Sequence, residues 1–458
     1  MRLLKIKTAV IYLLFLGLCS CKQAEIKSLE TAKTNFIVIF ADDLGYGDLS
    51  SFGHPSIKTP HLDQMAIEGQ RWTNFYVASS VCTPSRAALL TGRLPFRSGM
   101  TNVLFSNSKD GIPQKEITLA EQLKTAGYAT ACIGKWHLGD QKKFLPTEHG
   151  FDYYFGIPYS NDMDLPEWVN ANGTNYWKFW NDPKNLDSNN FNVPLLRNTE
   201  VIERPANQTT LTQRYTEETS NFIKENKNQP FFIYLAHTMP HVPLFASEAF
   251  SGKSDRGLYG DVVEEIDYNV GQILSTLKKE GLAENTLVVF TSDNGPWKQF
   301  KENGGSAGPL KGGKGSTWEG GVRVPTIFWS PKKIKKGMVT HLGTTMDLFP
   351  TFSRLAGIPI PTDRKMDGYD LSPSLFQFQK NQRESVYYYR GENLFAIRNG
   401  KYKAHFITKK GNGFFGGTEI QNPPLLYDLS SDPSEKYPLK EANPEVLKKM
   451  NELKARHQ

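Results

Sequence analysis

The sequence predicts an α/β fold: a large, mixed but mostly parallel sheet sandwiched by helices, followed by a small C-terminal α+β domain with an antiparallel sheet. Unbroken apolar runs, typical of strands buried on both faces of a parallel sheet, recur along the chain. Segments with helical periodicity separate them, as βαβ connections require. Each run ends in ionisable or metal-binding residues, which is typical of an open α/β sheet with its site at the carboxyl edge. The runs are 35–41, 128–134, 231–236 and 286–291.

Polar side chains follow each of these four runs. Because the carboxyl ends of parallel strands meet at one edge of a sheet, we expect these side chains to lie together. Taken alone, an Asp-Asp pair is usually a helix cap and Asp-Asn-Gly is usually a turn, but their joint placement favours a site. In chain order the residues are Asp42, Asp43, Lys135, His137, His237, His241, Asp293 and Asn294.

Three segments have the periodicity or the caps of helices. Residues 118–127 begin with a Thr cap followed three residues later by Glu and end in Gly, and residues 261–281 repeat apolar residues at helical spacing. Residues 345–357 are predicted to form another helix. Residues 158–205 lack periodicity and are rich in Trp, Asn, Asp and Pro. They predict a long surface insertion near the mouth of the site, which either selects the substrate or has no functional role.

The composition changes after about residue 375, which predicts a main domain over 35–375 and a C-terminal α+β subdomain over 376–458. Residues 385–390 are predicted to form a strand, and 394–407 a hairpin that turns at Asn-Gly. The last 15 residues contain an amphipathic helix, 444–457.

The first residues have the charged, apolar and small-residue regions of a secretory signal, and their apolar run is too short to span a bilayer. The sequence Leu18-Cys-Ser-Cys21 resembles a bacterial lipobox. We therefore expect residues 1–20 to be a lipoprotein signal peptide and 21–34 to be a tether. The protein would be exported and anchored by a lipid on Cys21 to a bacterial membrane, in the periplasm or at the cell surface. A plain secreted protein is the alternative.

Composition narrows the possible functions. The 458 residues, 39% of them hydrophobic, suffice for a large core, and loss of residues 1–20 would lower the formal charge from +7 to +4. That charge is compatible with an anionic substrate but does not indicate nucleic acid, because the one basic cluster, 332–336, is typical of a solvated loop. After processing, only Cys82 and Cys132 would remain as free thiols. An exported chain with so few cysteines is not a disulfide scaffold, which favours a chemical role for Cys82.

Cys82 lies just before a predicted helix in which Pro84 takes the first position. Free backbone N–H groups and the helix dipole there favour an anion, and Arg86, one turn further on, can add its charge. One hypothesis is a nucleophile that faces an anionic group. The alternative is a small buried cysteine at the start of an ordinary helix.

The acidic residues at the strand ends predict a site for a hard cation. Asp42, Asp43, Asp293 and Asn294 offer only oxygen donors, and three adjacent carboxylates would repel one another without a cation. This set favours Ca²⁺ or Mg²⁺ over Zn²⁺. Lys314 lies in a segment, 308–317, whose glycines allow the backbone to approach an anion.

These motifs resemble those of type I sulfatases. Cys82-Thr-Pro-Ser-Arg86 matches the Cys-x-Pro-x-Arg signature, and the similarity extends over 33–458. Residues 156–160 and 424–429 look closest to the branch of arylsulfatase A and N-acetylgalactosamine-6-sulfatase. The resemblance implies an alkaline-phosphatase-like fold in which residues 35–375 form the catalytic sulfatase domain.

The resemblance also implies a role for each site residue. A maturation enzyme would convert Cys82 to formylglycine, whose hydrate supplies the nucleophile, and one Ca²⁺ would be held by Asp42, Asp43, Asp293 and Asn294. Lys135, Lys314 and Arg86 would neutralise charge in the transfer, and Ser160 would contact the substrate. His137 would take a proton from the hydrate, and His241 would protonate the departing alcohol, with His237 as the alternative acid.

The expected function is hydrolysis of an aryl or, more in keeping with the branch, a carbohydrate sulfate ester. Two alternatives stay open at this stage. One is a phosphonate monoester or phosphodiester hydrolase of the same superfamily, which can use the same motif. The other is a lipid-anchored protein that binds sulfated glycans without turning them over, with Cys82 never oxidised.

Overall fold

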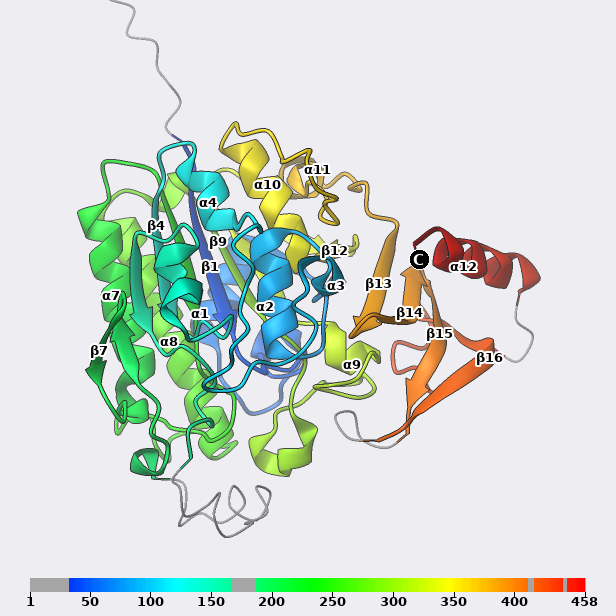
Figure 1. The fold of residues 1–458 in the computed structure, drawn as a ribbon, viewed down its shortest axis with the longest axis horizontal. Coiled ribbons are helices and arrows are strands. Elements are labelled where there is room, and N and C mark those ends of the chain that lie inside the picture. Colours follow the sequence, from blue (N-terminus) through cyan, green and yellow to red (C-terminus); the bar gives the residue numbers. More distant parts are fainter. Residues whose placement is uncertain (1–32, 166–186, 411–415, 440–442, 458) are drawn as a thin grey trace, which may run out of the picture. The chain divides into compact units, whose positions relative to one another are not determined.

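The computed structural model describes residues 33–165, 187–410, 416–439 and 443–457, and within them a ten-stranded sheet carries helices on both faces (Figure 1). Five adjacent strands in the middle of this sheet are parallel. The predicted α/β class with a mixed, mostly parallel sheet is confirmed. The five strands, in spatial order, are β9 (Thr286–Ser292), β1 (Asn35–Ala41), β8 (Phe231–Ala236), β4 (Ala129–Gly134) and β5 (Tyr153–Gly156).

Shorter strands complete both edges of the sheet. Beyond β9 lie β10 (Thr326–Trp329), β2 (Gln70–Trp72) and β11 (Gly337–Val339), and beyond β5 lie β6 (Leu195–Arg197) and β7 (Glu200–Glu203). Strands β6 and β7 fall within the predicted insertion 158–205, of which residues 166–186 lie outside the described residues. The sequence missed both strands because runs of three and four residues are too short for a period-2 pattern to emerge.

Strand β1 is buried on both faces, and its side chains alternate between two core clusters. Phe36, Val38 and Phe40 point to one cluster, and Ile37 and Ile39 point to the other. The first cluster lies under α2 (Cys82–Thr91), α4 (Leu119–Lys124), α10 (Leu348–Leu355) and α11 (Ser372–Gln377), and the second under α1 (Pro60–Glu68), α7 (Leu211–Glu225) and α8 (Leu258–Lys279).

The predicted helices are present with small shifts at their ends. Thr118 and Glu121 form the expected capping box at the start of α4, and α8 begins three residues before the predicted 261. The predicted helix 345–357 is divided into a 3₁₀ turn, Thr345–Asp347, and α10. Short elements outside these are α3 (Pro95–Ser98), α9 (Glu319–Val322) and the two-stranded pair β3 (Phe75–Tyr76) and β12 (Gly343–Thr344).

The C-terminal part of the chain forms an antiparallel four-stranded sheet and a helix. The predicted hairpin turns at Asn399-Gly400, as expected. The sheet consists of β13 (Ser385–Arg390), β14 (Asn393–Asn399), β15 (Tyr402–Lys409) and β16 (Thr418–Asp428), and it is followed by α12 (Pro444–His457). Residues from Lys33 onward form one compact unit, and the domain limits at 375 and 376 stay predictions.

The predicted signal peptide, lipid-bearing Cys21 and most of the tether lie outside the described residues. Over the part of the chain that the structure describes, none of the helices combines the length and the apolar character needed to cross a bilayer.

Buried charges join the C-terminal sheet to the first residue of α9, Glu319. The ammonium of Lys403 on β15 lies 3.0 Å from Glu319 Oε1 and 3.3 Å from Glu435 Oε1, and all three side chains are fully buried. Glu435 also accepts a hydrogen bond from the backbone N–H of Glu319 at 2.6 Å. Burial alone would raise the pKa of Glu319, but the charges of Lys403 and two arginines lower it to about 2. The C-terminal sheet therefore fixes the end of the glycine-rich segment that carries Lys314.

We expect Lys403→Met to destabilise the protein by about 3–5 kcal/mol, because it leaves two buried carboxylates without their shared cation. The matched control is Lys401→Met, which removes an ammonium that is more than half exposed beside Asp428 and should leave the stability nearly unchanged. Denaturant unfolding of both variants measures the difference. Equal losses of unfolding free energy in the two variants would show that the buried charges do not hold the C-terminal sheet to α9.

Candidate active site at the carboxyl edge of the sheet

The structure brings together the side chains that follow β9, β1, β8 and β4, which are consecutive neighbours in the sheet. Asp42 and Asp43 follow β1, and Asp293 and Asn294 follow the last residue of β9. The backbone N–H of Asp43 donates to Asp293 Oδ1 at 3.0 Å, and the Asn294 amide donates to Asp43 Oδ1 at 2.6 Å. The residues that follow β1 and β9 thus lie together at one sheet edge, as expected, and their functional roles stay predictions.

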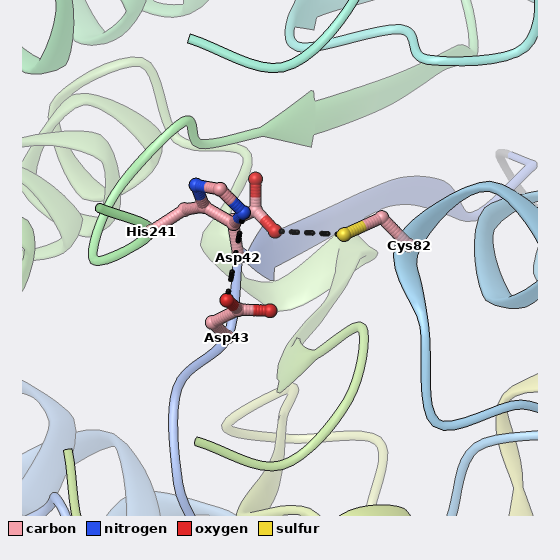
Figure 2. A group of neighbouring side chains, drawn as sticks. All are labelled: Asp42, Asp43, Cys82 and His241. Carbon is pink, nitrogen blue, oxygen red and sulfur yellow. Dashed lines mark hydrogen bonds and ion pairs between the residues drawn. The ribbon is translucent and has the colours of Figure 1, made fainter. Parts of the chain in front are cut away.

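Cys82 faces this cluster from the N-terminus of α2. Its Sγ lies 3.5 Å from Asp42 Oδ1, and the side chain is 2% exposed (Figure 2). The helix begins at Cys82 itself, so Pro84 is its third residue rather than its first. A proline is tolerated there because N–H groups in the first turn have no intrahelical partner. Burial, reinforced by Asp42 and Asp293, raises the pKa of the thiol well above its usual value despite Lys135 and Lys314, so the unmodified thiol is a poor nucleophile.

Arg86 points to the carboxylates rather than to open space. Its Nε and Nη2 atoms both donate to Asp293 Oδ2, at 3.1 and 2.7 Å, and Nη1 donates to the backbone oxygen of Lys135 at 3.0 Å. Nη2 also lies 3.5 Å from Asp42 Oδ1. The guanidinium is fully buried. Arg86 therefore joins three of the four strand ends.

Two lysines neutralise the remaining carboxylate oxygens. Lys135 binds Asp42 Oδ2 and donates to Ser160 Oγ at 3.1 Å, and Lys314 donates to Asp43 Oδ2 at 2.7 Å. The ammonium of Lys314 also lies 4.2 Å from the centre of the Trp297 ring. These contacts place Ser160 and both lysines in the site, although Lys314 comes from a segment that is far from the strands in sequence.

The oxygen donors fit a hard divalent cation. Asn294 Oδ1 is buried and has no hydrogen-bond partner within the described residues. This oxygen is therefore available to coordinate a cation. Burial and repulsion by Asp42 raise the pKa of Asp293 to about 7, which indicates that the three cationic side chains do not fully compensate these carboxylates. Oxygen ligands of this kind suit Ca²⁺ or Mg²⁺.

A second grouping shares two of these ligands. Donor atoms of Asp42, Asp43, Cys82 and His241 lie within 4.8 Å of one another. We favour the oxygen set that includes Asp293 and Asn294, because its unpartnered amide oxygen is otherwise unexplained. Cys82 and His241 then lie beside the cation site rather than in it.

The three histidines have different surroundings. His137 Nε2 lies 2.8 Å from the backbone oxygen of Leu104, while Nδ1 is buried and has no hydrogen-bond partner in the described part of the chain. His241 Nε2 lies 3.6 Å from Asp43 Oδ2, and its Nδ1 contacts the backbone oxygen of Val242. His237 is fully buried, and neither ring nitrogen has a hydrogen-bond partner among the described residues. Burial lowers the pKa of all three imidazoles, to about 4 for His237.

Two residues of the site were not predicted. Trp297 packs against both Lys314 and His241, the latter with ring centres 5.4 Å apart, and Asp162 lies next to Ser160. Trp297 comes three residues after Asn294 and could have been suspected from that proximity. Asp162 sits in a polar stretch without periodicity, so no signal in the sequence distinguishes it from a surface loop residue.

The chain matches two family models, Sulfatase over residues 34–358 and the C-terminal region of aryl-sulfatase over residues 381–458. Arylsulfatase A of Homo sapiens is 43% identical over 444 residues, which cover 92% of this chain and 86% of the relative. N-acetylgalactosamine-6-sulfatase of Canis lupus familiaris is 41% identical, with 93% and 85% covered.

Solved structures agree with these matches. The PsFucS1 sulfatase from Pseudoalteromonas sp. superposes with a TM-score of 0.82 at 30% identity, covering 93% of this chain and 90% of that one. Ps i-CgsB in complex with k-i-k-neocarrahexaose gives a TM-score of 0.75 at 32% identity, with 92% of both chains covered. The phosphonate monoester hydrolase of Agrobacterium radiobacter, with 18% identity and a TM-score of 0.62 over 93% of this chain and 96% of that one, shares the fold alone.

Proposed function

We propose, from the premise that this chain belongs to the sulfatase family and is a sulfatase enzyme, that it hydrolyses sulfate esters of carbohydrates. The observation that carries the proposal is the position of Cys82, at a helix N-terminus and 3.5 Å from a carboxylate that Lys135 and Arg86 neutralise. Relatives named for a sulfated amino sugar and a similar structure solved with neocarrahexaose support a carbohydrate substrate.

The proposal includes conversion of Cys82 to formylglycine by a separate maturation enzyme. The buried, neutral thiol supports this step, because the unmodified side chain is a poor nucleophile where it lies. The hydrate of formylglycine supplies one hydroxyl to attack sulfur and a second whose deprotonation expels the bound sulfate, a route that serine or cysteine lacks.

Asp42, Asp43, Asp293 and Asn294 would hold one Ca²⁺. When bound, the cation polarises the sulfate oxygens and stabilises the charge that develops on them. Lys135 contacts Asp42 and Lys314 contacts Asp43, and both lysines would bind the remaining sulfate oxygens. Arg86 would orient Asp293 and Asp42 through its contacts with both carboxylates.

The positions of the histidines support the acid and base roles that we propose for them. His137 is fixed through its Nε2 contact to Leu104 and leaves its buried Nδ1 free to accept a proton from the nucleophile. His241 shares the Cys82 cluster and directs Nε2 toward the site, so we assign it the proton for the departing sugar oxygen. Arrival of an anionic ester beside His241 favours its protonated form. Neither ring nitrogen of His237 has a hydrogen-bond partner within the described residues, which makes it the weaker candidate.

The competing functions are less well supported. The phosphonate monoester hydrolase shares only the fold with this chain. A non-catalytic glycan-binding role would not explain why Cys82 is buried beside the charged side chain of Asp42. We further propose that the enzyme is exported and anchored to a bacterial membrane through a lipid on Cys21, as its first residues predict.

Peptide mass spectrometry of protein purified from its own host should show the mass loss expected when the Cys82 thiol is replaced by an aldehyde. The same protein should release sulfate from an aryl sulfate and from at least one sulfated sugar. Cys82→Ala should reduce release to background, a loss of about 10³-fold or more. Cys132→Ala, which changes the other described free cysteine, should keep activity. An unmodified Cys82 without turnover would favour the glycan-binding alternative.

Removal of the metal with a chelator should abolish sulfate release, and added CaCl₂ should restore it. Asn294→Ala should weaken Ca²⁺ binding by about tenfold or more, because it removes the amide oxygen that has no other partner. Calorimetric titration of CaCl₂ into the protein measures the affinity, with Asn269→Ala, a buried asparagine of α8, as the control. Unchanged affinity in Asn294→Ala would remove Asn294 from the ligand set.

The two candidate acids can be separated by the leaving group. His241→Ala should lower kcat/KM for a sugar sulfate by about 10²-fold or more, because an alkoxide needs a proton as it departs. The loss should be much smaller for 4-nitrophenyl sulfate, whose phenolate departs without one. His237→Ala should affect both substrates alike. The reverse pattern would make His237 the acid.

A further inference from the structure

Trp297 is an aromatic side chain in the site to which the proposed reaction assigns no role. It is partly exposed, whereas Asp293 and Asn294, which shortly precede it in the chain, are fully buried. The centre of its ring lies 5.4 Å from the centre of the His241 ring and 4.2 Å from the Lys314 ammonium. Trp297 therefore contacts both a residue that we assign to the departing oxygen and a residue that we assign to sulfate binding.

The indole of Trp297 is held in place by its own segment of the chain. Its N–H donates to Gln299 Oε1 at 2.7 Å, and the buried Phe300 packs edge-on against it with ring centres 4.9 Å apart. The backbone N–H of Lys314 donates to the backbone oxygen of Pro296 at 2.9 Å, so the segment that carries Lys314 is joined to the residue before Trp297. A ring that is fixed in this way needs little further ordering when a ligand packs against it.

The contacts of His241 indicate where the departing sugar lies. A general acid must come within about 3 Å of the oxygen that it protonates. Because the carbon bonded to that oxygen belongs to the sugar, the sugar must pack against side chains beside His241. Two such side chains are Asp43, whose Oδ2 lies 3.6 Å from His241 Nε2, and Trp297. Asp43 is bound to Lys314 and Asn294, whereas Trp297 offers an apolar surface.

A partly exposed indole suits a ligand that is itself a ring with an apolar face. The equatorial hydroxyls of a pyranose project from its rim, so its C–H groups can pack flat on an aromatic ring while these hydroxyls stay in water. We propose that Trp297 is the surface on which the ring of the departing sugar packs, so that the site favours sulfate esters of cyclic sugars over those of small acyclic alcohols. This inference rests on the proposed function and adds to it a residue that determines specificity for the leaving group.

The test compares sulfate esters that have the same charge, with and without a sugar ring. Calorimetric titration of methyl sulfate and of galactose 3-, 4- and 6-sulfate into full-length Cys82→Ala protein with Ca²⁺ gives their dissociation constants without turnover. The galactose sulfate that binds most tightly should bind about tenfold more tightly than methyl sulfate, or better. Adding Trp297→Ala should reduce this preference by about tenfold and leave the affinity for methyl sulfate within about twofold, because methyl sulfate has no ring to pack on the indole.

Two further variants serve as controls. Trp297→Phe keeps an aromatic face and should keep most of the preference. Tyr268→Ala removes a partly exposed ring of α8 that also contacts a histidine, His61, with ring centres 6.2 Å apart, and it should keep the whole preference.

The proposal is overturned if Trp297→Ala leaves the preference for the sugar sulfate within about twofold of the parent protein. It is also overturned if methyl sulfate loses as much affinity as the sugar sulfate, which would show that the indole only positions Lys314. A parent protein without any preference for the sugar sulfates would overturn it even if Trp297→Ala did not fold.

The outcome is distinguishable from that of the test of the proposed function. Failure of the wild-type enzyme to release sulfate from any ester would refute the function, whatever the affinities of the Cys82→Ala proteins. Normal sulfate release combined with an unchanged preference in Trp297→Ala would refute only the role of Trp297.

Discussion

Three carboxylates that converge at the ends of β1 and β9 are the constraint on which the site depends. Desolvation and mutual repulsion make such a group unfavourable in a protein interior unless opposite charges accompany it. Here burial would raise the pKa of Asp42, but Lys135 and the neighbouring cations hold it well below its usual value. The same cations compensate the charge of Asp293 less fully, and burial together with repulsion by Asp42 raises its pKa to about 7. The positions of Arg86, Lys135 and Lys314 follow from this requirement, and the remaining imbalance is what a divalent cation would remove.

The fold meets this constraint by placing the charges on rigid elements. Strand β1 pairs with β9 along its whole length and with β8 over residues 36–40, and it is buried on both faces, so the residues at its end have little freedom to separate. Arg86 projects from a helix that is buried at all ten positions and binds groups from three strand ends. Cys82 begins the same helix. The geometry between Cys82 and the carboxylates is therefore set by the main sheet and not by surface loops.

The sequence was sufficient to predict the parts of this arrangement that follow from periodicity and topology. Apolar runs identified the central strands, and parallel pairing then required the residues after them to meet. Short edge strands such as β6 were missed because few residues carry the pattern. The direction in which Arg86 points was also not predictable, since its spacing from Cys82 is compatible with facing either an anion or the carboxylates. Apart from Ser160, the groups that act on Asp162 are Lys135 and Lys314, which come from distant parts of the chain.

Buried carboxylates are also paired with cations at a second place, where the C-terminal sheet contacts the main part of the structure. Lys403 and His405 on β15 enclose Glu435, and Glu435 in turn binds the N–H of Glu319 and, through its backbone oxygen, the ammonium of Lys311. These contacts hold both sides of the segment that carries Lys314. A change in the C-terminal sheet would thus act on a lysine that contacts Asp43 at 2.7 Å. The C-terminal part of the chain consequently belongs to the machinery of the site, because it positions one of the charges that the buried carboxylates require.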